Sequence, residues 1–595
     1  MRLIIPEVLG TEPVDSRLAR LAEFFGIPVQ FLPLESYLPP SPSNLDRAIG
    51  EGEGCFVVNP RVLGKWFSNE GTASELRSYL VSRFPFILVH NLHPEPVSAD
   101  TIACLSAGRF QAVQAIPSSD LSYTFPKDAR DVCGPYSGLS FGPTNPATDR
   151  VLVGDRSDGN MQTLIEIDGH PFFARLPSPA SEIFFLGSGD VVDLDEETRD
   201  TSLIGYFSRF APLLMAMRKA FGEACWRPNN PYASLIIDDP YLRDHYGYLN
   251  FRNVLALMDA RQFHTSIAFI PYNYRRNSPE IVRLFRERPD RYSLCVHGND
   301  HTAAEFTERE PARLNSMIQT ALSRMNALAK KTGLSYDNVF VFPQGNFSVS
   351  ALNLLKANNF CAAVNSRPFP QEEAASLSVA DFARPAIMKY GGFPLFLRRG
   401  VRDTRPEHVA FALLIGKPVL IVEHHSVFQH PERIAEVVAR VNAIAPEIRW
   451  SSLGAGLMQS YLQRRTTEGT LEIQTFACSG MVKNNSQASL RCLVVKREGL
   501  PVSLDHVVLD GESTCNFTAQ NGDVRFSFDV PPRAFRTFSL VYHNDFGLAD
   551  VNGGWRRDFG VFLRRRLSDA RDNYLSKSQT FLSLANYVYE RMRRK

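Results

Sequence analysis

The sequence has little of what marks secreted or membrane-spanning proteins. Its nine cysteines are scattered and form no Cys-x-x-Cys pair, which argues against a disulfide framework and against a zinc site built from thiolates. Apolar runs stay below the roughly 18 residues of a membrane span, because the candidate Leu203–Phe221 contains three basic residues. Pro6 and Glu7 interrupt the apolar start of the chain, so we expect no export signal.

An excess of charge of one sign is also absent. The chain has 65 Lys and Arg residues and 63 Asp and Glu residues, for a formal net charge of +2. It also contains 44% hydrophobic and 22% charged residues, which is typical of a folded soluble protein. We therefore expect a cytoplasmic protein without a nucleic-acid partner.

At 595 residues the chain is too long for one hydrophobic core, and its patterns change along its length. Residues 1–225 predict an α/β layer domain that ends in a small antiparallel sheet, and we assign no chemistry to it. Residues 228–465 alternate strands and helices, which predicts a (β/α) barrel of about seven parallel strands, closed or slightly incomplete. Residues 468–545 predict an antiparallel β-sandwich, and residues 546–595 a helical tail.

The tail is the one strongly basic segment. Arg556–Lys595 holds eleven basic and four acidic residues. Its basic groups alternate with Trp555, Phe559 and Phe562, which predicts a helix with an apolar stripe. Two interpretations are open: peripheral contact with a membrane, or a basic helix that packs on its own β-sandwich.

Residues that can act as acids, bases or metal ligands follow several strands of the predicted barrel. Asp238 and Asp239 follow the first strand, the two histidines of His297–His301 follow the third, and His424 and His425 follow a late one. Alone, the aspartate pair and the His297–His301 pair are more often structural, as a helix cap or as ordinary hydrogen-bonded histidines, and His424 with His425 is as often structural as functional. The carboxyl ends of barrel strands meet at one mouth, where active sites are built. The joint occurrence therefore predicts an active site there.

At these positions the sequence resembles the polysaccharide deacetylases of carbohydrate esterase family 4, over Pro231–Gln463. Ile236–Asp239 is similar to the Thr-Phe-Asp-Asp segment of that family, and His297–His301 keeps the spacing of its His-Ser/Thr-x-x-His segment. Ile421–His424 is similar to its Leu-x-His segment, and His425 follows one residue later. The resemblance implies an enzyme that hydrolyses the N-acetyl group of an amino sugar in a poly- or oligosaccharide.

The resemblance also implies a role for each residue. The catalytic base is Asp238, the ligands of one divalent metal ion are Asp239, His297 and His301, and the catalytic acid is His424 or His425. One carboxylate and two imidazoles suit Zn best, with Co, Mn and Ni as alternatives. The expected partner is an N-acetylated glycan whose sugar the sequence does not name, and the sequence does not indicate an oligomeric state.

One segment departs from the family pattern. The Arg-x-Pro-aromatic-Gly segment, whose arginine orients the base in the family, reads Val341–Gly345 here, with neither the arginine nor the aromatic residue. One hypothesis is an enzyme in which another cation, such as Arg384 or Arg398, orients Asp238. A second is a non-catalytic carbohydrate-binding protein that retains the metal site. A glycosidase-like barrel is a third, but Glu423 is its only candidate for a second carboxylate.

Overall fold

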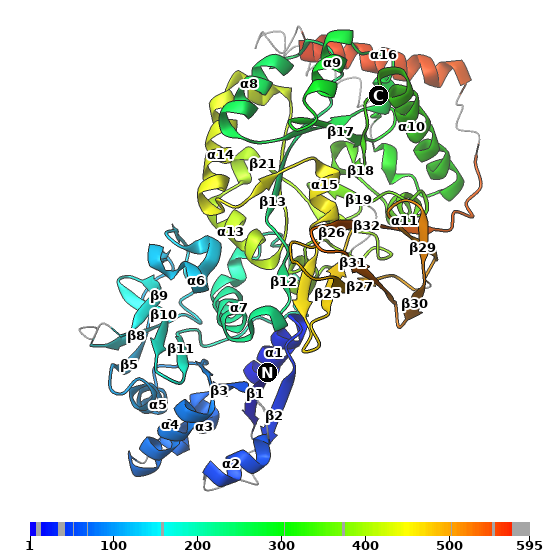
Figure 1. Cartoon of the computed structure of the whole chain (residues 1–595). Coiled ribbons are helices and arrows are strands. Elements are labelled where there is room, and N and C mark those ends of the chain that lie inside the picture. The colour runs from blue at the N-terminus through cyan, green and yellow to red at the C-terminus, as the bar shows by residue number, and fades with distance from the viewer. Residues whose placement is uncertain are drawn as a thin grey trace.

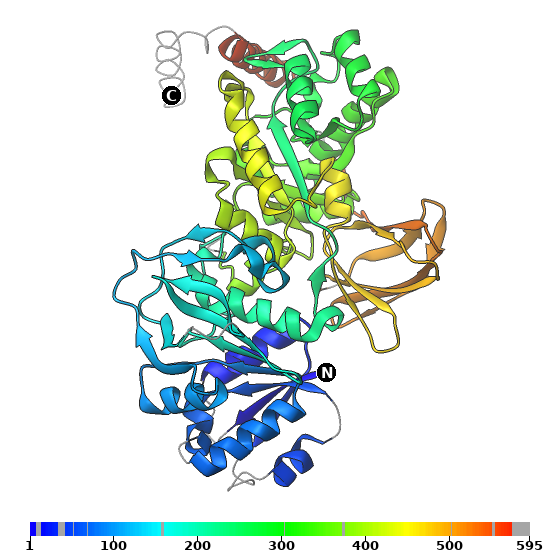
Figure 2. The same cartoon turned by 60° about the vertical axis from the view of Figure 1, so that its left-hand side comes forward.

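The computed structural model describes residues 1–7, 13–33, 42–50, 53–67, 70–155, 160–302, 304–371, 375–500, 502–549 and 554–573. Figures 1 and 2 show a first region at the N-terminus, a central barrel and a pair of sheets near the C-terminus. The predicted multidomain α/β architecture is confirmed, whereas the domain boundaries given above stay predictions.

The first region is built on a nine-stranded mixed sheet in the order β2-β1-β3-β4-β11-β10-β9-β6-β7. The parallel strands are β2 (Val29–Pro33), β1 (Arg2–Glu7), β3 (Gly54–Val58), β4 (Phe86–Val89) and β11 (Glu182–Leu186). The antiparallel strands are β10 (His170–Pro177), β9 (Gln162–Ile167), β6 (Tyr123–Thr124) and β7 (Ser140–Phe141). The expected small antiparallel sheet is therefore not separate, because β11 joins it to β4.

Helices cover this mixed sheet, and a two-stranded sheet lies outside it. The helices of the region are α1 (Pro13–Phe24), α2 (Pro42–Ile49), α3 (Pro60–Phe67), α4 (Glu70–Arg83), α5 (Pro96–Leu105) and α6 (Arg130–Cys133). Strand β5 (Phe110–Ala115) pairs with β8 (Arg150–Gly154) in a two-stranded sheet.

The apolar run near residue 210 forms helix α7 (Phe207–Phe221), which packs between the first region and the barrel. Its Phe210 ring lies 6.1 Å from the ring of Phe25, and 5.5 Å from that of Phe411 in α13 (Pro406–Ile415). Burial on two sides accounts for an apolar helix. Among the described helices, none is both long enough and apolar enough to cross a membrane.

The central region is a nearly closed barrel of eight parallel strands in the order β20-β19-β18-β17-β16-β13-β22-β21. The strands are β13 (Tyr232–Asp238), β16 (Thr265–Phe269), β17 (Tyr292–His297), β18 (Asp337–Val341), β19 (Ala362–Asn365), β20 (Leu395–Leu397), β21 (Arg399–Gly400) and β22 (Val419–Glu423), and β23 (Arg449–Trp450) pairs beside β13. The main helices are α8 (Phe251–Arg261), α9 (Pro279–Glu287), α10 (Pro311–Thr332), α11 (Val349–Ala357), α13 and α14 (Pro431–Ile444). The predicted barrel is thus confirmed.

The strands that the sequence did not predict, β20 and β21, bring the two edges of the barrel together. They are consecutive pieces of one extended segment, and only Arg398 separates them. The first piece pairs with β19, and the second pairs with β22 at the other end of the sheet. The backbone N–H of Arg398 also donates to the Asn365 carbonyl at 3.0 Å. The barrel therefore approaches closure at Arg398.

Small and branched apolar side chains fill the barrel. Alternate residues of its strands, including Ile236, Val341 and Phe396, share one buried cluster. Leu453 and Leu457 of helix α15 (Leu453–Met458) join this cluster at the base of the strands. Because side chains alternate along a strand, Asp238 lies on the same interior side as Ile236, and Arg398 on the same side as Phe396. The two charged residues therefore meet inside the mouth.

The third region consists of two sheets. The six-stranded sheet contains β12 (Arg227–Pro228), β24 (Leu462–Arg465), β25 (Leu471–Thr475), β27 (Leu490–Arg497), β31 (Asp523–Val530) and β30 (Phe517–Gln520), and the four-stranded sheet contains β26 (Ser479–Lys483), β32 (Phe535–Tyr542), β28 (Leu504–Leu509) and β29 (Ser513–Cys515). The rings of Phe526 and Phe538 lie 5.2 Å apart across the two sheets. The sequence predicts antiparallel pairing throughout, but β25 and β27 are parallel.

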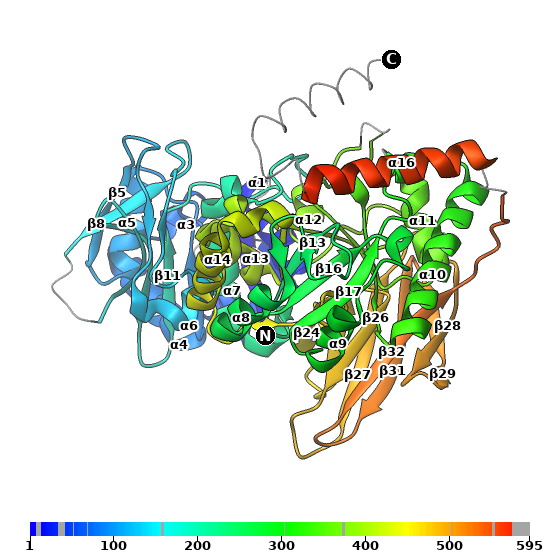
Figure 3. The ribbon, with the colours of Figure 1, turned by 90° about the horizontal axis from the view of Figure 1, so that it is seen from above.

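The last described helix, α16 (Gly554–Asn573), lies across the mouth of the barrel (Figure 3). The Tyr246 hydroxyl donates to Asp572 at 2.8 Å, and the Gly247 N–H donates to Asn573 at 2.9 Å. The interpretation in which this helix packs on the β-sandwich is therefore wrong, because loops of the barrel hold it. Residues 574–595, the rest of the predicted tail, lie outside the described residues.

A buried group of charges joins the barrel to the C-terminal sheets. Glu498, which follows β27, forms ion pairs with Lys496 of that strand and with Lys356 of α11. The Tyr542 hydroxyl donates to the same carboxylate at 2.7 Å. The side chains of the three ionic residues are at most 6% exposed. Both ammonium groups therefore depend on one carboxylate for neutralisation.

Replacing this carboxylate by its neutral isostere, Glu498→Gln, should destabilise the protein by about 3–5 kcal/mol, because two buried ammonium groups lose their counter-charge. The transition midpoint in urea measures this, and Glu468→Gln, at an exposed position, is the matched control. Equal midpoints for the two variants would show that the buried group does not stabilise the contact between the regions.

Candidate metal centre at the mouth of the barrel

The two neighbouring aspartates at the end of β13 point in different directions. Asp238 is the last residue of the strand and is 3% exposed. Asp239 leaves the strand with a φ of 84°, a conformation that residues other than glycine rarely adopt. This turn separates the two carboxylates, so that one lies in the barrel and the other faces the histidines of β17. Backbone strain of this kind is common at functional sites.

The loop between the two histidines, Gly298–Asp300, folds around a buried carboxylate that the sequence analysis did not find. Glu305, 8% exposed, accepts hydrogen bonds from the backbone N–H groups of Asn299, Asp300 and His301 at 3.3, 2.7 and 3.0 Å. Burial raises the pKa of Glu305 to about 7, although the N–H donors act in the opposite direction. The carboxylate thus fixes the turn that brings His301 back toward His297.

Glycine is required in this loop. Gly298 has a φ of 63°, and a Cβ atom there would lie 2.4 Å from Pro343 Cγ and 2.9 Å from a Glu305 oxygen. The close approach of Pro343 therefore leaves no room for a serine or threonine side chain at this position.

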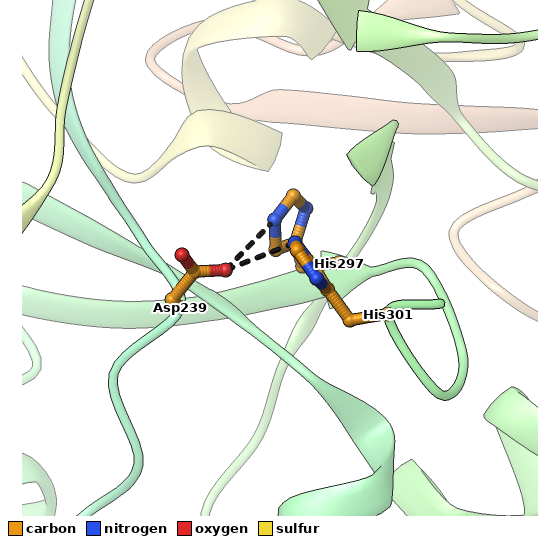
Figure 4. A group of neighbouring side chains, drawn as sticks. All are labelled: Asp239, His297 and His301. Carbon is orange, nitrogen blue, oxygen red and sulfur yellow. Dashed lines mark ion pairs between the residues drawn. The ribbon is translucent and has the colours of Figure 1, made fainter. Parts of the chain in front are cut away.

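Asp239, His297 and His301 converge on one point (Figure 4). Asp239 Oδ1 lies 3.4 Å from His297 Nε2 and 3.1 Å from His301 Nε2. All three candidate ligand atoms lie within 4.8 Å of one another. His297 Nδ1 is 3.0 Å from the carbonyl of Val341, its acceptor, which leaves Nε2 free to bind a metal ion. Among the described residues, no other three His, Cys, Asp or Glu side chains converge in this way.

The chemistry of this set fits a divalent metal ion. Asp239 Oδ1 is buried, and in the described part of the chain its polar contacts are the two histidine Nε2 atoms, neither of which forms a hydrogen bond of normal geometry with it. Burial raises the pKa of Asp239, but the charge of His301 and the contacts with both histidines lower it well below its usual value. An ionised oxygen beside two imidazole nitrogens is a ligand set that suits zinc and its neighbours.

Asp238, one residue earlier, is held by Arg398 rather than by the histidines. Both guanidinium Nη atoms donate to its carboxylate, at 2.7 and 2.6 Å. Burial raises the pKa of Asp238, but the charges of Arg398, His297 and His424 and the Arg398 hydrogen bonds outweigh it and lower the pKa. Asp238 is therefore ionised and fixed in orientation.

The cation that pairs with Asp238 comes from another part of the barrel than Val341–Gly345. Val341 points into the barrel, so an arginine there would reach the mouth from β18. Arg398 reaches the same mouth from the segment between β20 and β21. Of the two cations considered from the sequence, Arg384 does not take part, because its guanidinium lies 5.2 Å from the ring of Phe24.

The two histidines after β22 have different surroundings. His424 is exposed, and its charge contributes to the low pKa of Asp238. His425 is buried beneath α16, with Nε2 3.8 Å from Asp572 Oδ1 and its ring 5.2 Å from that of Tyr246. A Cβ atom at Gly247 would lie 2.1 Å from His425 Nδ1, so this loop closes tightly over the ring. Only His424 is open to a ligand in the mouth.

The metal centre predicts that replacing both histidines, His297→Ala with His301→Ala, abolishes the binding of one divalent ion per chain, because a single carboxylate remains. Asp238→Asn should keep the ion, since Asp238 is paired with Arg398. Zinc titration calorimetry and elemental analysis of the purified proteins measure this. The same metal content in the double variant and in the native chain would rule out the site.

No protein-family model and no curated protein matches the sequence. Among solved structures, the carbohydrate deacetylase Agd3 matches 91% of this chain and 98% of its own, at a TM-score of 0.47 and 9% identity. A family 4 carbohydrate esterase from Streptomyces lividans and the peptidoglycan N-acetylglucosamine deacetylase Bc1960 each match 38% of this chain, and 92% and 89% of theirs, at TM-scores of 0.24 and 0.25 and identities of 14% and 12%. Carbohydrate deacetylases are thus among the solved structures to which this chain is similar, and its activity has to be argued from the site itself.

Proposed function

We propose that the barrel hydrolyses the N-acetyl group of an amino sugar in a poly- or oligosaccharide. One observation carries the proposal. The ligand atoms of Asp239, His297 and His301 converge beside the ionised carboxylate of Asp238, which pairs with Arg398 and is not one of the ligands. A metal site alone suits many functions. A metal site beside a fixed, deprotonated base at the mouth of a barrel suits hydrolysis.

Asp238 acts as the base in this proposal. The bidentate ion pair with Arg398 keeps the carboxylate ionised and leaves further lone pairs on its oxygens to accept a proton from water. Arg398 then stabilises the charge that Asp238 regains when the proton moves on. When bound, a divalent ion, zinc or else Co, Mn or Ni, supplies Lewis-acid chemistry that activates water and polarises the acetamide carbonyl.

His424 acts as the acid. Its imidazole is exposed at the mouth, close enough to Asp238 to act on its pKa, and so can reach the nitrogen of a departing sugar amine. His425 is enclosed by Tyr246, Gly247 and Asp572. We assign His425 a positioning role, because it links the loop after β22 to helix α16.

The competing hypothesis, a carbohydrate-binding protein without turnover, depended on the missing motif arginine. Because Arg398 occupies the place of that arginine on the base, the reason for expecting inactivity is removed. Glu423, the candidate acid of a glycosidase, instead accepts the backbone N–H of Val401 at 2.9 Å. Hydrolysis of the amide is the function that uses all the converging residues.

Asp238→Asn should lower kcat by at least about 10²-fold with the metal still bound, because the base is lost and the ligands are kept. His424→Ala should lower kcat by a similar factor, and His425→Ala should have a smaller effect. Acetate release from an N-acetylated oligosaccharide measures all three. A larger loss in His425→Ala than in His424→Ala would reverse the assignment of the acid.

The dependence of activity on pH tests Arg398 directly. Its charge lowers the pKa of Asp238, and activity requires ionised Asp238, so activity is lost as pH falls through that pKa. Arg398→Gln should raise the pKa and move the acidic limb of the kcat/KM profile to higher pH. Arg384→Gln should leave the limb in place. An unmoved limb in Arg398→Gln would mean that another group sets it.

For the tail we propose peripheral contact with an anionic membrane. On α16 the side chains of Phe559, Phe562, Leu563 and Leu567 are 45–57% exposed, which leaves an apolar stripe next to basic residues. The full chain should co-sediment with anionic vesicles at low salt and detach as salt rises. A Leu563→Ser, Leu567→Ser variant should bind less. Equal sedimentation of the variant and the native chain would contradict the contact.

A further inference from the structure

A groove of about 340 Å³ lies between α16, α10 and the residues that follow β16. Five of the eight residues that line it are arginines, and no lining residue is acidic: Arg275, Arg276, Arg324, Arg565 and Arg566. Tyr272, Tyr274 and Phe562 complete the lining. The groove is therefore both basic and aromatic, and the deacetylase chemistry uses none of these residues.

Two of the five arginines are neutralised by carboxylates outside the lining. Arg276 pairs with Asp569 at 2.7 Å, and Arg324 pairs with Asp300 at 2.6 Å. In the described part of the chain, the other three arginines form no ion pair. The groove therefore carries three uncompensated positive charges, which is more than one carboxylate ligand would neutralise.

The buried, unsatisfied guanidinium group of Arg565 is the strongest evidence that the groove binds an anion. The residue is 4% exposed, and its Nε and Nη2 atoms are buried without a hydrogen-bond partner. Unsatisfied donors on a buried charge are costly, so such a residue normally has an acceptor. The planar fork of a guanidinium matches the oxygens of a phosphate or a carboxylate. An anionic group in the groove would supply the missing acceptors.

The groove also borders the metal centre. Arg324 donates to the Asn299 side chain at 2.6 Å, and the Tyr272 N–H donates to the Asn299 carbonyl at 3.0 Å. Asn299 lies between the two metal-site histidines, so the groove and the ligand loop share a wall. A substrate with its acetamide at the metal centre could therefore place an anionic substituent in the groove.

We propose that this groove binds a phosphate group carried by the glycan substrate. A phosphate dianion neutralises two of the three uncompensated positive charges, and the tyrosine rings offer faces on which a sugar can stack. That the phosphate belongs to an acetylated glycan rests on the proposed deacetylase function. That the groove binds phosphate does not.

Titration calorimetry on the full chain tests the groove without any turnover. N-acetylglucosamine 1-phosphate and pyrophosphate should bind, and neutral N-acetylglucosamine should bind more weakly. An Arg275→Ala, Arg566→Ala double variant should bind both phosphate ligands at least about tenfold more weakly, because two charge-assisted contacts are lost. Arg565→Gln should do the same. Arg283→Ala, which removes an exposed arginine of α9 outside the groove, is the matched control and should bind as the native chain does.

The outcomes separate this proposal from others. Arg565→Gln removes a buried guanidinium group, which can destabilise the fold. If this single variant is unstable, the Arg275→Ala, Arg566→Ala double variant provides the test, because both of its residues are exposed. Phosphate binding that is equal in the native and double-variant proteins would overturn the proposal. Binding to anionic vesicles with none to the soluble phosphates would also overturn it, and would place the phosphate on a lipid. Arginine-dependent binding without any acetate release would support the groove and contradict the deacetylase function.

Discussion

The ion pair between Arg398 and Asp238 is the contact on which the site depends. It joins the first strand of the barrel to the segment where the two edges of the sheet meet. Arg398 therefore lies where the barrel nearly closes and also fixes the orientation of the base. Removing one partner of a buried ion pair destabilises a fold by several kcal/mol. The structure of the barrel mouth therefore depends on Asp238 staying ionised. The cation on the base comes from the far edge of the barrel, and Val341 at the end of β18 supplies none.

The remaining parts of the site are arranged around that fixed base. Asp239 turns away from Asp238 through a left-handed backbone, and Glu305 folds the histidine loop through three N–H groups. The two carboxylates consequently have separate partners, cationic for Asp238 and imidazole for Asp239. Separate partners allow one carboxylate to hold a metal ion while its neighbour remains available for proton transfer. Helix α16 completes the mouth from the other end of the chain and carries the basic groove next to the same loop.

Much of this could be predicted from the sequence, because the relevant signals are local. The barrel strands are short apolar runs between helical patterns, and Asp239, His297 and His301 follow such runs. The pieces β20 and β21 have three and two residues, too short for a strand pattern, so the sequence could name Arg398 only as one of two candidate cations. Glu305 shows no signal, since only a folded loop aims three N–H groups at it. The contact of Asp572 with Tyr246 spans 326 positions and could not be read from either segment alone.

The proposed function requires that the barrel turns over an N-acetylated glycan with a bound divalent ion. The most direct measurement is acetate release from an N-acetylglucosamine oligosaccharide by the native chain, first loaded with zinc, then stripped with a chelator and then reloaded. We expect one acetate per new free amine, loss of activity on chelation and recovery on reloading. Binding of the oligosaccharide without acetate release, with zinc and also with cobalt, manganese or nickel, would contradict it.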